Sequence, residues 1–229
     1  MKKLLSLLLC ITIFFGTQFD HKPLIIPTSS SNNYNILIPN SYKDTVLFPN
    51  TFLVLANTNH YFDNNYIPSN LDVITNYDID YIKRPNEQIA LKKEALIDLE
   101  KMIIAMRQVG LNVYVFSGYR SYTKQISIYE STINKSEVAL PGFSEHQSAL
   151  AVDLSTLRDG LSQYFSDTLE YHWLYENSYK YGFILRYPKD KEHITGYSFE
   201  PWHYRYVGIY AQNIKNQITL EEYIYNYLT

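Results

Sequence analysis

The chain has 229 residues, of which 20 are basic and 23 acidic, and it contains one cysteine. Its formal net charge of −3 excludes a protein that binds nucleic acid through a basic surface. The single cysteine, Cys10, lies in the first apolar segment, so the rest of the chain can hold no disulfide, no cysteine nucleophile and no thiolate metal ligand. A metal site in this chain would therefore use histidine, aspartate and glutamate.

The first residues are typical of an export signal. Lys2 and Lys3 precede the apolar stretch 4–15, which is shorter than the roughly 20 residues that a membrane-spanning helix needs. We therefore predict a signal peptide over residues 1–18 and a secreted or extracytoplasmic protein. Since the residues from Gly16 onward match a cleavage site only loosely, an uncleaved N-terminal segment that anchors the chain to the membrane is the alternative.

Residues 19–45 contain clusters of proline, serine and asparagine, which favour a flexible spacer over a folded element. Residues 46–229 then form a single folded domain, because their number suits one hydrophobic core. Without residues 1–18 the chain keeps 18 basic and 23 acidic residues, a net charge of −5. The apolar run at 52–56 predicts the strand that opens the domain.

Helices and strands follow in a mixed order. Apolar residues at helical spacing predict a helix over 87–109, which Gly110 ends. The further predicted elements are a strand at 113–116, a helix at 122–132, a strand at 149–154, a helix at 168–181, strands at 183–187 and 203–207, and a helix at 210–227. Helices that come first and strands that follow indicate an α+β domain rather than a βαβ array.

Two short segments combine histidines with carboxylates. In the first, six residues separate His146 from Asp153, and the small and apolar residues 149–152 indicate a buried strand that carries Asp153. A buried carboxylate is normally paired or bound to a metal, because an unpaired one costs several kcal/mol. This spacing alone is a weak signal, and a histidine in a turn with an aspartate that caps the next element also explains it.

Glu200 and His203 lie in the second segment, among aromatic and apolar residues. A separation of three residues places two side chains on one face of a helix, but Pro201 disfavours a regular helix here. Spacing alone therefore leaves open whether both side chains reach one site. Together the two segments contain the groups for a zinc site with three protein ligands, an open position and a nearby general base.

Three other charged residues lie close to these segments. Arg186 and Arg205 belong to strand-like runs, and we expect them to pair structurally with carboxylates. Glu145 is compatible both with contact to the site and with exposure to solvent.

With these segments the chain resembles a known family. The residues that carry the resemblance are Ser144, His146, Asp153, Glu200 and His203. Their pattern is similar to that of the D-alanyl-D-alanine carboxypeptidases of the vancomycin-resistance type, in the zinc peptidase group that includes lysostaphin-like endopeptidases and the hedgehog signalling domain. The resemblance also includes the segments 55–68, 117–121 and 181–188, and it covers about 53–215.

The resemblance implies a single α+β domain in which a small, mainly antiparallel sheet carries the zinc site and helices flank it. It implies one Zn²⁺ per chain, and the residues that it places at the metal are His146, Asp153 and His203. It implies Glu200 as the catalytic base. The residues that it places at the substrate are Arg120, Ser144 and Gln125. Among these Arg120 would also act in catalysis, by polarising the scissile carbonyl or clamping a carboxylate.

One position departs from the family pattern. Ala149 stands where the family usually has glycine, and its methyl group can alter close backbone packing or the shape of the cleft. All four positions of the metal ligands and the base are intact, so we expect activity to be kept.

The implied activity is the removal of the terminal D-alanine from peptidoglycan stem peptides, of either the D-Ala-D-Ala or the L,D type. A wall endopeptidase is one alternative. A non-catalytic module that binds cell-wall peptides is another, and the loss of Glu200 or of a ligand would mark it, which the sequence does not show. We expect peptidoglycan stem peptides as partners, no nucleic acid, membrane contact only through an uncleaved N-terminal segment, and a monomer.

Overall fold

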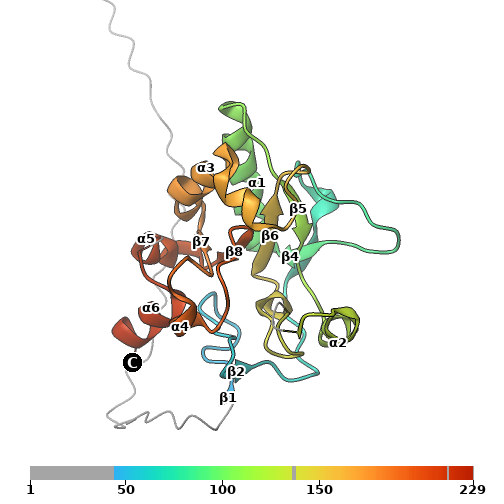
Figure 1. Ribbon diagram of the computed structural model, residues 1–229, viewed down its shortest axis with the longest axis vertical. Helices are drawn as coiled ribbons and strands as arrows, with labels where there is room; N and C mark the ends of the chain where they lie inside the picture. Colours follow the sequence, from blue (N-terminus) through green and yellow to red (C-terminus); the bar gives the residue numbers. More distant parts are fainter. Residues whose placement is uncertain (1–43, 136–137, 216, 229) are drawn as a thin grey trace, which may run out of the picture. The chain divides into compact units, whose positions relative to one another are not determined.

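The computed structural model describes residues 44–135, 138–215 and 217–228 (Figure 1). The predicted signal peptide at 1–18 lies outside these residues, as does the predicted spacer apart from residues 44 and 45. In the described part of the chain, no helix is both long and apolar enough to cross a membrane.

A four-stranded sheet occupies the centre of the domain (Figure 1). Its strands are β5 (Tyr114–Ser117), β6 (Ala151–Ser155), β7 (Phe183–Leu185) and β8 (His203–Tyr206). Their order across the sheet is β5-β6-β8-β7, and each neighbouring pair is antiparallel. The strands β6 and β8 are central, so each has a neighbour on both sides.

Two short strand pairs accompany this sheet. They are β1 (Asp44–Thr45) with β2 (His60–Tyr61), which is parallel, and β3 (Leu71–Val73) with β4 (Ala90–Lys92), which is antiparallel. The prediction of a strand at 52–56 is wrong. This segment is largely buried, but the only β-bridge that it makes within the described chain joins Leu55 to Leu47.

The longest helix, α1 (Lys93–Gln108), begins six residues later than predicted. The reason is that residues 90–92 pair with β3 as strand β4, so they are not free to start the helix. Gly110 follows the helix with a φ of +79°, a conformation that suits glycine. The buried face of α1 is formed by Ala95, Leu96, Leu99, Met102, Ile103 and Met106.

The other helices are α2 (Tyr122–Ser131), α3 (Leu169–Asn177), α4 (Glu192–Thr195), α5 (Ala211–Ile214) and α6 (Leu220–Tyr227). Short 3-10 turns are η1 (Ile74–Asn76), η3 (Glu145–Ser148), η4 (Gln163–Asp167), η5 (Ser178–Tyr181) and η6 (Gly208–Tyr210). The predicted helix at 168–181 is α3 followed by η5, with the Thr168 hydroxyl as its N-cap.

The single helix predicted at 210–227 is wrong. Lys215 has a φ of +47°, which is incompatible with a continuing right-handed helix. A new helix, α6, begins after Thr219, whose side chain accepts a hydrogen bond from the backbone N–H of Glu222 while the Glu222 side chain accepts one from the N–H of Thr219. These two hydrogen bonds form a capping box, which starts a new helix at this point of the segment that was predicted to be one continuous helix.

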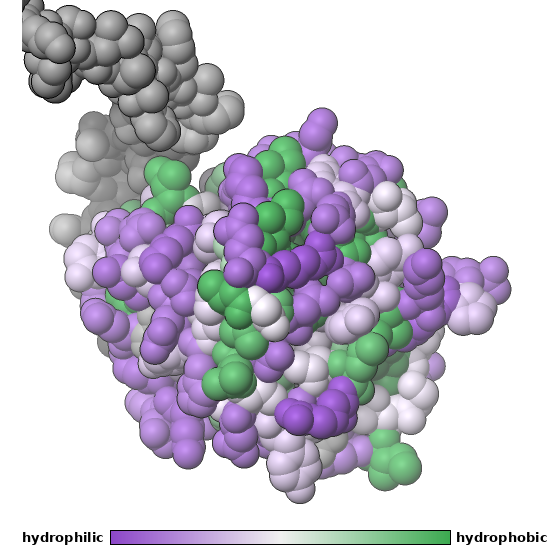
Figure 2. Space-filling model, turned by 90° about the horizontal axis from the view of Figure 1, so that it is seen from above, coloured by the Kyte–Doolittle hydropathy of each residue, from purple (hydrophilic) through white to green (hydrophobic). Residues whose placement is uncertain are grey.

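Side chains alternate across β6, and this alternation separates the core from the site. Val152 and Leu154 pack in the same hydrophobic core as the buried face of α1. Asp153, between them, projects from the opposite face of the sheet. Seen from above, the surface is mainly hydrophilic with small separate apolar areas (Figure 2), as is usual for a domain with its apolar residues concentrated inside. The α+β fold with a small antiparallel sheet is confirmed.

Candidate active site

Strand pairing brings Asp153 and His203 together. The two residues are direct partners in the antiparallel register of β6 and β8, so their side chains share one face of the sheet. His203 Nδ1 lies 3.2 Å from Asp153 Oδ1, and both side chains are 5% exposed.

His146 reaches the same place from the 3-10 turn η3. Its Nε2 lies 3.2 Å from Asp153 Oδ2, and its Nδ1 lies 2.7 Å from the carbonyl oxygen of Gly118. A Cβ on Gly118 would lie only 2.6 Å from the carbonyl oxygen of Ala90, so glycine is needed for the close approach of the two backbones. The carbonyl fixes the ring of His146 so that Nε2 faces Asp153.

These three residues fit a metal ion. One ligand atom from each of His146, Asp153 and His203 can be chosen so that all lie within 4.8 Å of one another. Asp153 Oδ1 is buried and accepts no hydrogen bond from any described residue, although His203 Nδ1 is close. Two imidazoles and one carboxylate are a donor set of catalytic zinc sites. Metal-binding histidines ordinarily donate a hydrogen bond from the ring nitrogen that does not bind the metal, and Nδ1 of His146 has the carbonyl oxygen of Gly118 as such a partner.

The charges around the triad also suit a cation. Burial alone would raise the pKa of Asp153, but the two histidines more than offset it and hold that pKa well below its usual range. Burial lowers the pKa of His146, which favours the neutral ring that a ligand needs. Burial would lower the pKa of His203 too, but its contacts with Asp153 and Glu145 raise it to about 9, so a metal has to displace a proton there.

Glu200 comes beside the triad through a tight turn rather than a helix. The backbone N–H of His203 donates to the Glu200 carbonyl at 3.1 Å, which closes a turn directly before β8. Glu200 Oε2 lies 3.4 Å from His203 Nδ1. Burial raises the pKa of Glu200 to about 7, against the opposing effect of His203. A carboxyl group with a pKa near neutral can both take up and return a proton.

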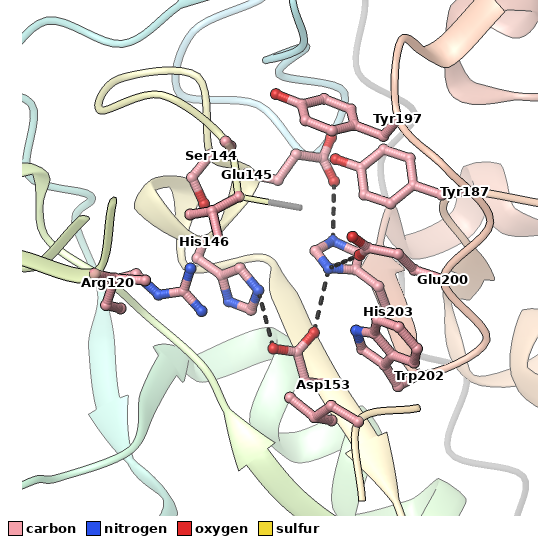
Figure 3. Close-up of a pocket in the computed structure, with 14 residues that line it drawn as sticks. Arg120, Ser144, Glu145, His146, Asp153, Tyr187, Tyr197, Glu200, Trp202 and His203 are labelled. Atoms are coloured by element: carbon pink, nitrogen blue, oxygen red, sulfur yellow. Dashed lines mark ion pairs between the residues drawn. The ribbon is translucent and has the colours of Figure 1, made fainter. Parts of the chain in front are cut away.

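A cavity of about 230 Å³ lies over these residues (Figure 3). The residues of the predicted site that line it are Arg120, Ser144, His146, Asp153, Glu200 and His203. Tyr187 and Tyr197 line it as well, and the ring centroids of Tyr187 and His203 are 4.8 Å apart. Sequence reasoning missed both tyrosines, because no spacing distinguishes them among the 23 tyrosines of the chain.

Arg120 is held in a fixed orientation at the cavity. Its Nη1 donates to Gln125 Oε1 at 2.9 Å and its Nη2 donates to Ser117 Oγ at 3.1 Å. Gln125 is 1% exposed, and its Nε2 donates to the carbonyl of Ala139 at 2.7 Å. Gln125 thus contacts Arg120 and is not among the residues that line the cavity, and its predicted contact with the substrate stays a prediction.

The two arginines predicted to pair with carboxylates do so in the interior. Arg186 and Arg205 are fully buried, and both donate to Glu145 Oε1, at 2.8 Å and 2.6 Å. Glu145 was compatible from the sequence with either contact to the site or exposure to solvent, and the structure buries it fully. Its own burial would raise its pKa, but the two arginines hold the pKa well below the usual range, so the carboxylate is ionised.

Comparison with known proteins agrees with this geometry. Residues 88–209 match the VanY family, described as D-alanyl-D-alanine carboxypeptidase. The putative carboxypeptidase YodJ of Bacillus subtilis is 40% identical over 191 residues, which are 79% of this chain and 69% of that protein.

Solved structures are similar as well. The LdcB LD-carboxypeptidase, whose structure concerns peptidoglycan recognition, has 40% sequence identity and a TM-score of 0.71 over 77% of this chain and 87% of its own. A vancomycin-resistance D,D-pentapeptidase VanY in complex with Zn(II) has 36% identity and a TM-score of 0.57 over 75% of this chain and 98% of its own. The predicted resemblance and the predicted enzyme class are confirmed: the chain belongs to the VanY family of D-alanyl-D-alanine carboxypeptidases.

Proposed function

We propose that the chain removes the terminal D-alanine from peptidoglycan stem peptides, with one zinc ion held by His146, Asp153 and His203 and with Glu200 as the general base. The observation that carries this proposal is that the buried metal-binding triad, Glu200 and Arg120 line a single cavity. Metal, base and substrate clamp would then act on the same peptide bond.

The residues of the cavity divide the chemistry among them. A zinc ion on the triad supplies Lewis-acid polarisation of the scissile carbonyl and lowers the pKa of water. Glu200, beside His203, takes the proton of the attacking water and returns it to the departing amine of D-alanine. Arg120 remains charged and offers a planar fork, so it stabilises the developing oxyanion or clamps the terminal carboxylate. Ser144, at the cavity wall, offers a hydroxyl group to the peptide.

Two stem peptides are candidate substrates. One similar structure is an LD-carboxypeptidase and the other a D,D-pentapeptidase, with 40% and 36% sequence identity over 77% and 75% of this chain. The first comparison favours a tetrapeptide with D-alanine after an L-centre, and the second favours a pentapeptide that ends in D-Ala-D-Ala.

We also propose that residues 1–18 export the chain, that 19–45 separate the domain from the membrane or signal, and that 46–229 form the catalytic domain. The basic and apolar start of the chain supports this, and so does a substrate that lies outside the cell membrane. The mass of the protein recovered from the culture medium and from the membrane fraction tests it, because cleavage would remove about 18 residues.

D-alanine release tests the activity. The full-length chain, purified in mild detergent because of its apolar start, is offered each peptide with and without a chelator and with zinc added back. Zinc-dependent release from one peptide would establish the reaction and its preferred substrate. If the protein binds zinc and releases no D-alanine from either peptide, the carboxypeptidase is overturned, and cleavage inside the stem or cross-bridge becomes the next reaction to measure.

A further inference from the structure

In Figure 3 the carboxylate of Glu145 lies above the ring of His203 and Asp153 lies below it, and the proposed reaction gives Glu145 no part. Its side chain is fully buried, and its Oε2 lies 3.7 Å from His203 Nε2. Among the described residues neither of these two atoms has a hydrogen-bond partner. Two buried polar atoms without partners thus face each other across a gap slightly longer than a hydrogen bond.

The carboxylate of Glu145 is held so that only Oε2 can meet the histidine. Its Oε1 accepts from Arg186 Nε at 2.8 Å and from Arg205 Nη1 at 2.6 Å. Arg186 is itself fixed by two hydrogen bonds to Glu221 on α6, at 2.9 Å and 2.7 Å. Arg205 Nη2 donates to the carbonyl of Val54 at 2.7 Å. Two buried acids and two buried arginines balance in charge, so the ionised Glu145 is not left as an unpaired buried charge.

The orientation of Glu145 has a consequence for the ring of His203. Nδ1 of that ring is the nitrogen that faces Asp153 and Glu200, so it is the atom available to a metal. An imidazole that binds a metal through Nδ1 keeps its proton on Nε2. A carboxylate oxygen only accepts hydrogen bonds, so Glu145 Oε2 favours that proton position. A shift of the ring by about 0.5 Å or slightly more would bring the two atoms within hydrogen-bond distance.

We infer that Glu145 is a positioning residue, which fixes His203 with its proton on Nε2 and its Nδ1 toward the metal, while Arg186 and Arg205 fix Glu145. The inference rests on the proposed zinc site. It assigns a role to a buried carboxylate next in sequence to a ligand, and it links the metal site through Arg186 to the C-terminal helix α6.

Two matched substitutions in the full-length chain separate positioning from simple structural support. In Glu145→Gln the amide oxygen stays with the two arginines, so the NH₂ group faces His203 Nε2 and can only donate. His203 then accepts at Nε2 and carries its proton on Nδ1, the metal-facing atom. Glu221→Gln removes an equal charge from the same buried network but has no contact with His203.

Zinc affinity is measured for the three proteins by competition with a chromogenic chelator, together with their unfolding temperatures. We expect both variants to lose stability, because each leaves a buried arginine uncompensated. Only Glu145→Gln should lose zinc affinity, by about 10- to 100-fold. Equal losses of affinity in the two variants, or wild-type affinity in Glu145→Gln, would overturn the inference.

A measurement on the unmutated chain covers the case in which Glu145→Gln does not fold. In the zinc-loaded protein with ¹⁵N-labelled histidine, His203 should show a slowly exchanging proton on Nε2, shielded by Glu145. A proton on Nδ1, or one on Nε2 that exchanges as fast as in a solvated imidazole, would overturn the inference. Neither measurement uses a peptide, so a chain that binds zinc as described and releases no D-alanine contradicts the proposed reaction alone.

Discussion

Asp153 and His203 are separated by 49 residues along the chain and stand directly opposite each other in the pairing of β6 with β8. The backbone hydrogen bonds of the sheet therefore set the distance between two of the three metal-binding side chains. The third, His146, comes from the turn that leads into β6, so all three depend on one strand. A rigid sheet is the kind of support that a metal site needs to keep its geometry.

Replacement of a triad residue should abolish metal binding. In His203→Ala the remaining two ligands cannot hold a catalytic zinc ion, so zinc per chain should fall well below one. The measurement is metal content after dialysis, by atomic emission. His172→Ala is the matched control, because His172 is exposed on α3 and does not line the cavity. Zinc content equal to wild type in His203→Ala would remove this residue from the metal site.

Replacement of the proposed base should separate binding from turnover. Glu200→Ala leaves the three ligands in place, so the variant should fold and retain zinc. Loss of general-base catalysis should lower kcat by about 10²- to 10⁴-fold. D-alanine release and zinc content are measured on the same preparation. Undiminished hydrolysis would show that Glu200 has no part in the reaction.

Gln125 should affect the reaction through Arg120. Gln125→Ala removes one of the two side chains that hold the guanidinium, so Arg120 gains freedom to move away from the substrate. A displacement of about 1 Å can cost as much as 10²-fold in rate, and we expect kcat/KM to fall by about 10-fold or more. Arg120→Lys should lose at least as much, because lysine lacks the planar fork.

The comparison of these two variants decides what Gln125 does. If Gln125 acts only by holding Arg120, adding Gln125→Ala to the Arg120→Lys chain should cost little further activity. Full additivity of the two losses in a double-mutant cycle would instead indicate that Gln125 contacts the peptide independently.

Ala149 should tolerate glycine and not a β-branched residue. It is buried and follows η3 with a φ of +60° and a ψ of +23°, a left-handed conformation that favours glycine. Ala149→Gly relieves backbone strain but loses a buried methyl group, so the free energy of unfolding should change by less than about 1 kcal/mol.

Valine at the same position gives the opposing test. Ala149→Val should lower the free energy of unfolding by about 2 to 3 kcal/mol, because a β-branched side chain is strained at this φ. Urea unfolding of the metal-free protein measures both variants. A valine variant as stable as wild type would contradict the left-handed conformation of Ala149.

Much of the site was accessible from the sequence because its residues come in short segments. His146 with Asp153, and Glu200 with His203, lie within eight residues of each other, in apolar or turn contexts that argue against ordinary surface charge. The sequence pattern likewise located α1, α2 and the central strands, and Gly110 marked where α1 ends.

The errors have local physical causes. Helix propensity continues through residues 87–92, but pairing with β3 takes the last three of them into a strand. The apolar residues from 210 to 227 suit one helix, but the positive φ at Lys215 and the capping box at Thr219 divide it. Backbone hydrogen bonding to other segments, or to a nearby side chain, decided each case against periodicity.

By itself the sequence determined which residue types the site contains: two histidines, an aspartate, a glutamate and an arginine. Since Cys10 is the one cysteine of the chain, the sequence also excluded a metal site built from several thiolate ligands. The tertiary structure alone decided how these groups meet. The register of β6 with β8 sets Asp153 against His203, and the burial of Glu145 between two arginines follows from contacts between segments 40 to 60 residues apart. Spacing along the chain cannot encode such contacts, because long-range packing and charge balance in the interior fix them.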